Sequence, residues 1–176
     1  MTPAPSIAWG QIPLFKDFPE AWLDEVKTIF QTETRTTGET LIAEGEPGDE
    51  LYILVSGRVR VSKAMLAKGM ALPIMDLQNT SKTLATLDQT TYPVFGEMAL
   101  IDHDTRSATI TVLEDAQFLV TSRDRFYGLM ERNPRLGNRL LLTIGKRLTA
   151  TIRRNNTELV KISTALALAL SRFVKA

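Results

Sequence analysis

The sequence predicts a mainly β fold with flanking helices, namely an antiparallel jelly roll of the cupin-like kind followed by a long C-terminal helix. Between about residues 29 and 120, short runs of β-forming residues alternate with turn residues, many of them glycine. Helical periodicity brackets this region on both sides. The 176 residues suffice for one domain and a long helix. We divide the chain into a flexible arm (1–13), a roll with its flanking helices (14–131) and a dimerisation helix (132–176).

The first elements are an arm and a short helix. Three prolines within residues 1–13 indicate a loose arm. Residues 14–26 predict a short amphipathic helix with Pro19 in its first turn. Its apolar face consists of Phe18, Trp22, Leu23 and Val26.

The roll follows as short strands separated by turns. We expect strands at residues 32–37, 41–43, 83–87, 106–113 and 117–121. The runs at 51–55 and 58–61 flank Ser56-Gly57 and form either a strand pair or one kinked strand. The connection from Ala64 to Lys82 is longer than a usual hairpin and rich in methionine. It is a flap, a partner surface or an ordinary long hairpin.

Helical signals return after the roll. Ser122 is a plausible cap for a helix that carries Phe126, Leu129 and Met130, and Asn133-Pro134 opens a longer helix. From Leu148 onward, one residue at every third or fourth position forms a heptad seam: Leu148, Ile152, Asn155, Leu159, Ile162, Leu166, Ala169 and Phe173. The seam predicts a parallel homodimer. The alternative is a helix that packs on its own roll.

Composition excludes several kinds of site. The chain has no cysteine, which rules out disulfides, thiolate zinc sites and iron–sulfur clusters. His103 is the one histidine, so we expect no metal. No nucleophile elbow, Walker loop or metal cluster is visible, so we expect no enzyme. The N-terminus lacks signal-peptide features and no apolar run is long enough to span a membrane, so we expect a soluble cytoplasmic protein without membrane contact.

The stretch that carries chemistry is Phe95-Gly96-Glu97-Met98-Ala99-Leu100-Ile101, followed by Arg106-Ser107-Ala108-Thr109. Gly96 permits a close backbone approach, and a short helical turn after it presents free N–H groups to an anion. Arg106 offers a planar fork of donors to two phosphate oxygens. Glu97 suits a sugar hydroxyl, and its charge is balanced by Arg106. The stretch therefore predicts a site for one phosphate and one hydroxyl.

This stretch resembles the phosphate-binding cassette of the cyclic-nucleotide-binding domain family, of the catabolite activator protein and protein kinase A regulatory subunit type. The run from Gly48 to Gly57, which reads Gly-Asp-x-Leu-Tyr-Ile-x-x-Ser-Gly, matches the roll of the same family. The resemblance implies that Glu97 binds the ribose 2′-OH and Arg106 the cyclic phosphate. The cradle is completed by Gly96, Met98, Ala99, Ser107 and Ala108, with Val61 and Leu84 as an apolar wall. The alternative is a structural salt bridge between Glu97 and Arg106.

The same resemblance gives roles to the long helix. It implies that Arg147 reaches back to Glu97 and that Thr151 faces the purine of a nucleotide bound by either subunit. Ile152 stands where a serine is found in the catabolite activator protein, so one hydrogen bond across the dimer is missing. The small Ser107 weakly favours cAMP, while cGMP remains possible.

We therefore expect a stand-alone cyclic-nucleotide sensor that relays binding through its C-terminal helix to an unidentified effector protein. One alternative is a dimerisation scaffold whose cassette no longer binds ligand. Another is a DNA-associated accessory protein, because seven Lys and Arg and no acidic residue occupy positions 132–157. Only about two dozen residues follow Thr151, too few for a helix-turn-helix domain, which argues against direct DNA contact.

Overall fold

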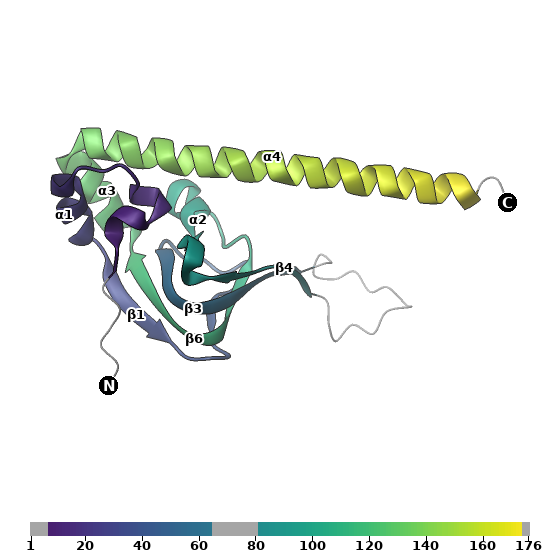
Figure 1. Ribbon diagram of the computed structural model, residues 1–176, viewed down its shortest axis with the longest axis horizontal. Helices are drawn as coiled ribbons and strands as arrows, with labels where there is room; N and C mark the ends of the chain where they lie inside the picture. The colour runs from purple at the N-terminus through teal and green to yellow at the C-terminus, as the bar shows by residue number, and fades with distance from the viewer. Residues whose placement is uncertain (1–6, 65–80, 174–176) are drawn as a thin grey trace.

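The fold is built on one six-stranded antiparallel sheet that curls into a roll (Figure 1). The computed structural model describes residues 7–64 and 81–173. Its main strand order is β1-β6-β3-β4, with β2 paired to β6 and β5 paired to β3. The strands are β1 (Gln31–Arg35), β2 (Thr40–Ile42), β3 (Leu51–Ala64), β4 (Ser81–Asp88), β5 (Val94–Phe95) and β6 (Thr109–Thr121). The predicted fold class is confirmed.

The two runs around Ser56-Gly57 form one kinked strand. Gly57 has a φ of +93°, and the β3–β6 register shifts on both sides of it. A Cβ at Gly57 would lie 2.5 Å from the carbonyl oxygen of Asp115, so the kink requires glycine. The prediction of separate strands at 106–113 and 117–121 was wrong, because β6 runs unbroken from Thr109 to Thr121, past the contact of Asp115 with Gly57. Arg106 therefore lies before β6 and not in it.

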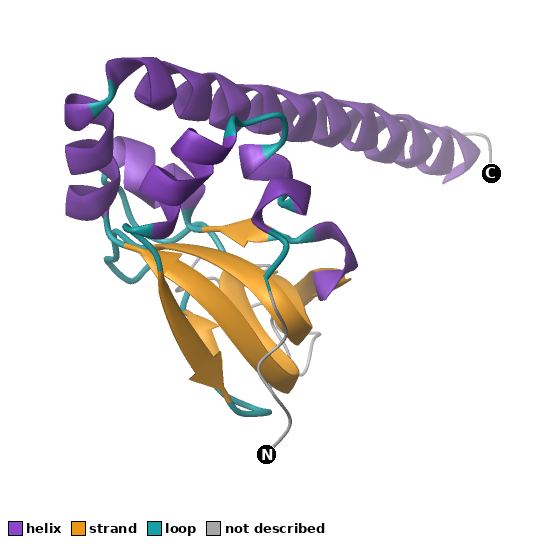
Figure 2. Cartoon of the chain, turned by 60° about the vertical axis from the view of Figure 1, so that its left-hand side comes forward, coloured by secondary structure: helices purple, strands orange, loops and turns teal. Residues whose placement is uncertain are grey.

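The helices gather at one end of the sheet (Figure 2). They are η1 (Trp9–Gln11), η2 (Pro13–Phe15), α1 (Glu20–Lys27), η4 (Gln89–Thr91), α2 (Glu97–Asp102), α3 (Arg123–Arg132) and α4 (Pro134–Phe173). Ser122 caps α3 by accepting a hydrogen bond from the N–H of Arg125 at 3.4 Å. Asn133 accepts one from the N–H of Leu136 at 3.2 Å and so caps α4. Both predicted helix starts are confirmed.

The N-terminal segment is less loose than predicted. The side chains of Ile12, Leu14 and Phe15 are fully buried in the core, so the ordered part of the chain begins before residue 14. The reason is apolar burial, which outweighs the breaking effect of the prolines. Pro19 precedes α1 as its N-cap and does not lie in its first turn.

Helices α2, α3 and α4 share one apolar cluster. Leu100 of α2 packs into the same buried group as Phe126 and Leu129 of α3 and Leu140 and Ile144 of α4. The first three turns of α4 thus belong to the core of the domain, so the boundary at residue 132 does not separate two folded units. From Thr149 to Ser171, every residue of α4 is exposed.

Two sequence predictions lie wholly or partly outside the described residues. The connection from Ala64 to Lys82 joins strands that pair up to Ala64 and Ser81, but its residues 65–80 lie outside the described part. The side chain of Phe173, the last seam position, also lies outside it. Within the described ranges, no helix is both long and apolar enough to cross a bilayer.

Candidate functional site

Arg106 is held in place by backbone pairing with the turn before β3. Its N–H donates to the carbonyl of Glu46 at 2.9 Å, and its carbonyl accepts from the N–H of Gly45 at 2.9 Å. These two bonds fix the start of the segment that leads into β6. The side chain is 6% exposed, which is unusual for an arginine. A buried guanidinium needs partners, and the structure supplies them from the same turn.

The partner of Arg106 is Glu50. The Nη2 atom of Arg106 lies 2.7 Å from Oε2 of Glu50, and its Nη1 atom lies 2.8 Å from the backbone oxygen of Glu50. The guanidinium carbon also lies 5.9 Å from the centre of the Tyr52 ring. The expectation that Arg106 balances Glu97 was therefore wrong. Glu50, immediately before β3, takes the ion pair instead.

Two glycines give the guanidinium its space. A Cβ at Gly48 would lie 2.6 Å from Nε of Arg106. A Cβ at Gly96 would lie 2.5 Å from Nη1 and would also collide with the backbone oxygen of Glu50. Gly96 has a φ of +82° and stands at the N-cap of α2. The predicted cassette glycine and arginine are therefore in direct proximity, with α2 starting immediately beside them.

Glu97 is the first residue of α2 and is largely enclosed by protein. Burial raises the pKa of its carboxyl above the ordinary value, while its own backbone N–H and the positive charge of Arg147 act in the opposite direction. Arg147 of α4 therefore acts on Glu97 through its charge, but the two side chains form no ion pair in the described part of the chain. The contact that the resemblance implies for Arg147 stays a prediction. A half-buried carboxylate with spare acceptor capacity suits a ligand hydroxyl group.

The remaining cassette residues differ in exposure. Ala99 is buried and Met98 is 46% exposed, which fits a short helix that lies on the core with one side open. Ser107 is exposed and Ala108 is half-buried. The carbonyl of Ser107 accepts a hydrogen bond from Nζ of Lys63 at 3.1 Å.

The outlying predicted residues are less well enclosed. Val61 is half-buried opposite Ala85 of β4. Leu84 is 54% exposed at the irregularity between β3 and β4. Thr151 is exposed on α4, beyond the turns that pack on the roll. Within one chain none of these three residues is buried, so they do not enclose the cradle by themselves.

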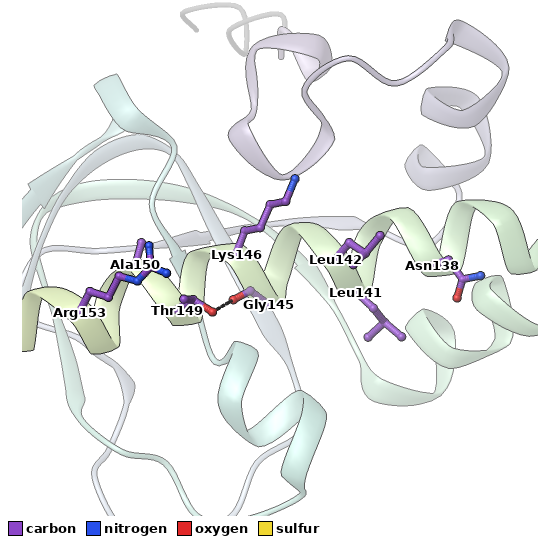
Figure 3. Close-up of a pocket in the computed structure, with 8 residues that line it drawn as sticks. All are labelled: Asn138, Leu141, Leu142, Gly145, Lys146, Thr149, Ala150 and Arg153. Carbon is purple, nitrogen blue, oxygen red and sulfur yellow. Dashed lines mark hydrogen bonds between the residues drawn. The ribbon is translucent and has the colours of Figure 1, made fainter.

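A shallow groove runs along an exposed face of α4, in part beside the turns whose other face is buried (Figure 3). Thr149 donates a hydrogen bond to the carbonyl of Gly145 at 2.8 Å within it. Leu141 and Leu142 are 36% and 61% exposed. The lining residues all belong to α4: Asn138, Leu141, Leu142, Gly145, Lys146, Thr149, Ala150 and Arg153. The groove shares no residue with the cradle around Arg106.

Sequence reasoning missed three contributors to the cradle. Glu50 and Tyr52 belong to the Gly48–Gly57 string, which predicted the roll but gave neither residue a role in the site. Lys63 lies near the end of β3, where no motif in the sequence pointed to a contact with the cassette. Arg123 was missed as well, and its Nη1 donates to the carbonyls of Leu100 and Ile101 at 2.5 and 3.3 Å. That side chain ties the end of α2 to the start of α3.

Metal ligands do not gather in the described part of the chain, where no group of three or more His, Cys, Asp or Glu could hold an ion. His103 is exposed and stands at the C-cap of α2 with a φ of +60°. The chemistry that the cradle offers is therefore hydrogen bonding and charge: one arginine, one half-buried carboxylate and free helix N–H groups.

Known proteins match this chain over the same region. The family described as the cyclic nucleotide-binding domain matches residues 33–133, more than half of the sequence. The cyclic AMP receptor protein of Thermus thermophilus is 29% identical over 136 residues, which cover 77% of this chain and 57% of that protein. The human cGMP-dependent protein kinase 2 is 34% identical over 116 residues, 65% of this chain but 14% of the kinase.

The fold has a matching solved relative. The crystal structure of the Thermus thermophilus catabolite activator protein superposes with a TM-score of 0.70 at 27% identity, covering 86% of this chain and 63% of that chain. The chain thus spans little more than half the length of the bacterial receptor and a small part of the kinase.

Proposed function

The chain belongs to the cyclic nucleotide-binding domain family, and from that premise we propose that it is a cAMP sensor that works by binding and not by catalysis. The observation that carries the proposal is the cradle. A buried arginine, a glycine at positive φ and the N-terminus of α2 meet at one place. Such a cluster offers several donors to a phosphate and has few other uses.

Ligand contacts follow from the positions of the charged groups. Arg106 has five N–H donors and uses two of them on Glu50, so the rest can reach a phosphodiester. Glu97 accepts a ribose hydroxyl, and Gly96, Met98, Ala99, Ser107 and Ala108 supply the rim. The small Ser107 after the arginine, by its resemblance to adenine-preferring relatives, supports adenine over guanine as the base, and the same cradle accepts cGMP more weakly.

Transmission of the signal runs through the shared apolar cluster. Arg123 connects the last carbonyls of α2 to α3, and Leu100 packs with residues of α3 and α4. A ligand that orders α2 in one position therefore favours one position of α4. The population shift follows from differential affinity for the two arrangements.

The long helix also supports a homodimer. Isolated helical segments in water are marginal, because most helix stability comes from packing of an apolar face. Yet residues 149–171 of α4 are exposed throughout, and Ile152, Leu159, Ile162 and Leu166 are each 59–63% exposed. We propose that a second copy covers this seam in a parallel coiled coil. The α4 groove overlaps the N-terminal end of this seam in sequence.

We infer that the signal then passes from α4 to a separate effector protein.

A melting experiment tests ligand binding. At a cAMP concentration 100 times its Kd, we expect about 2.7 kcal/mol of added stability, which raises Tm by roughly 5–10 °C for a domain of this size. A smaller rise with cGMP at the same concentration would agree with the base preference. No rise with either nucleotide at millimolar concentration would instead indicate a scaffold with a silent cassette.

A further inference from the structure

The cradle contains an anion of its own, because Glu50 lies beside the arginine that is proposed to bind the phosphate. Glu50 binds Arg106 through both its carboxylate and its backbone oxygen, at 2.7 and 2.8 Å. The carboxylate side chain is 41% exposed, whereas the arginine is 6% exposed. The pair is thus buried on the arginine side and open on the carboxylate side. A ligand that approaches Arg106 therefore also approaches Glu50.

This arrangement changes the electrostatics of the site without removing its donors. Within residues 7–64 and 81–173, Glu50 is the acceptor of the guanidinium, with one bond on each Nη atom, so three of its five N–H groups have no acceptor there and are left for a ligand. The positive charge, however, is already balanced by the Glu50 carboxylate. A phosphate therefore gains directional hydrogen bonds but little net attraction, and each negative charge on the ligand is repelled by Glu50.

We propose that Glu50 makes the cradle selective for singly charged phosphodiesters over doubly charged phosphomonoesters. The inference rests on the proposed function and adds the class of ligand that the site rejects. A cyclic phosphodiester carries one negative charge, whereas a terminal phosphate carries close to two at neutral pH. Repulsion by Glu50 therefore acts about twice as strongly on a 5′-nucleotide as on its cyclic form. Selectivity of this kind comes from a repulsive element and not from added contacts.

The test is calorimetric titration of the full chain and of Glu50→Gln with cAMP and with 5′-AMP at low salt. Glutamine keeps an oxygen acceptor for Nη2 and removes the charge. We expect the variant to bind cAMP about fivefold more tightly, and 5′-AMP about 25-fold more tightly, allowing for the partial exposure of Glu50. The preference for cAMP over 5′-AMP then falls about fivefold. Glu50→Ala should shift the preference in the same direction.

Salt separates an electrostatic role from a structural one. The gain from Glu50→Gln should shrink when ionic strength rises from about 0.05 to 0.5 M, because the charge is close to solvent. A purely structural contact would not respond in this way. Glu114→Gln is the matched control, since it removes the carboxylate from another arginine–carboxylate pair, with Arg58 on β3, outside the cradle. It should leave the preference unchanged.

The outcomes distinguish this inference from the proposed function. If wild type binds cAMP while Glu50→Gln leaves the cAMP to 5′-AMP preference unchanged, or weakens both nucleotides equally, Glu50 is only structural and the selectivity claim fails. If wild type binds neither nucleotide, the proposed function fails and this inference fails with it.

Discussion

Arg106 and Glu97 are the two charged side chains on which the proposed ligand binding depends, and each lies near an opposite charge from a different residue. Arg106 pairs with Glu50, seven positions before the kink at Gly57 of β3, and Glu97 is influenced by the positive charge of Arg147 on α4. Glu97, the proposed hydroxyl acceptor, is therefore coupled electrostatically to α4. Arg106, the proposed phosphate donor, is tied to the turn before β3.

Glu97 should destabilise the ligand-free protein at neutral pH. Burial raises its pKa in the folded state, so the folded protein disfavours the charged form. Below the unfolded pKa of about 4.3, the group is protonated in both states and has no effect. As pH rises toward and past the raised folded pKa, the penalty grows to its full value.

Glu97→Gln should therefore raise Tm at pH 7 and leave it nearly unchanged at pH 4. The same substitution should weaken cAMP binding by about 10-fold or more, because a hydrogen bond from the hydroxyl to a charged acceptor is lost. Melting curves across pH with and without cAMP measure both effects. A variant that is less stable at pH 7 would show that the Arg147 charge outweighs burial.

At the scale of elements, the kink of β3 positions the roll around the cradle. Gly57 and Gly38 have nearly the same φ, +93° and +92°. A Cβ at Gly57 would collide with Asp115 and Ala116, whereas nothing lies within 4 Å of a Cβ at Gly38. Substituting Ala at each of these two glycines therefore distinguishes the energetic cost of positive φ alone, at Gly38, from that cost plus a steric collision, at Gly57.

Gly38→Ala should lower the free energy of unfolding by about 1–2 kcal/mol, the conformational penalty alone. Gly57→Ala should lower it by at least ~2 kcal/mol more, because β6 must move away from β3. Urea unfolding of both variants gives the comparison. Equal losses of unfolding free energy in the two variants would mean that β6 moves aside without penalty, and that β3 and β6 are not tightly packed at Gly57.

At the scale of the whole molecule, α4 extends far beyond the roll (Figure 1). Leu136, Leu140 and Ile144 pack on their own domain, and Leu148 is half-buried against it. From Ile152 to Ala169, the seam residues are exposed and no described part of the chain covers them. The alternative that α4 packs along its own roll therefore holds only up to about residue 148.

Ile162→Asp should dissociate the homodimer, because it places an unpaired charge in the apolar seam. Light scattering at tens of micromolar should report about twice 19.6 kDa for wild type and 19.6 kDa for the variant. Thr164→Asp, two residues away and off the seam, is the control and should remain a dimer. A monomeric wild type would contradict the proposed dimer.

Patterns local in sequence predicted most of the fold and the centre of the site. The helix caps at Ser122 and Asn133 and the Gly96–Glu97 start of α2 were predictable, because each depends on neighbouring residues. The pairing of Arg106 with Glu50 was not, because 56 positions separate the partners. Register decides which carboxylate arrives beside the guanidinium. The merging of two predicted strands into β6 likewise depends on its long pairing with β3.

Calorimetric titration of cAMP into wild type and Arg106→Ala tests the central claim most directly. The account predicts one saturable site per chain in wild type, and loss of at least about 100-fold in affinity when the guanidinium is removed. Circular dichroism should show that the variant keeps its fold, because Glu50 is open to solvent on one side. Equal heats and affinities for the two proteins, or no saturable heat in wild type up to millimolar cAMP, would contradict it.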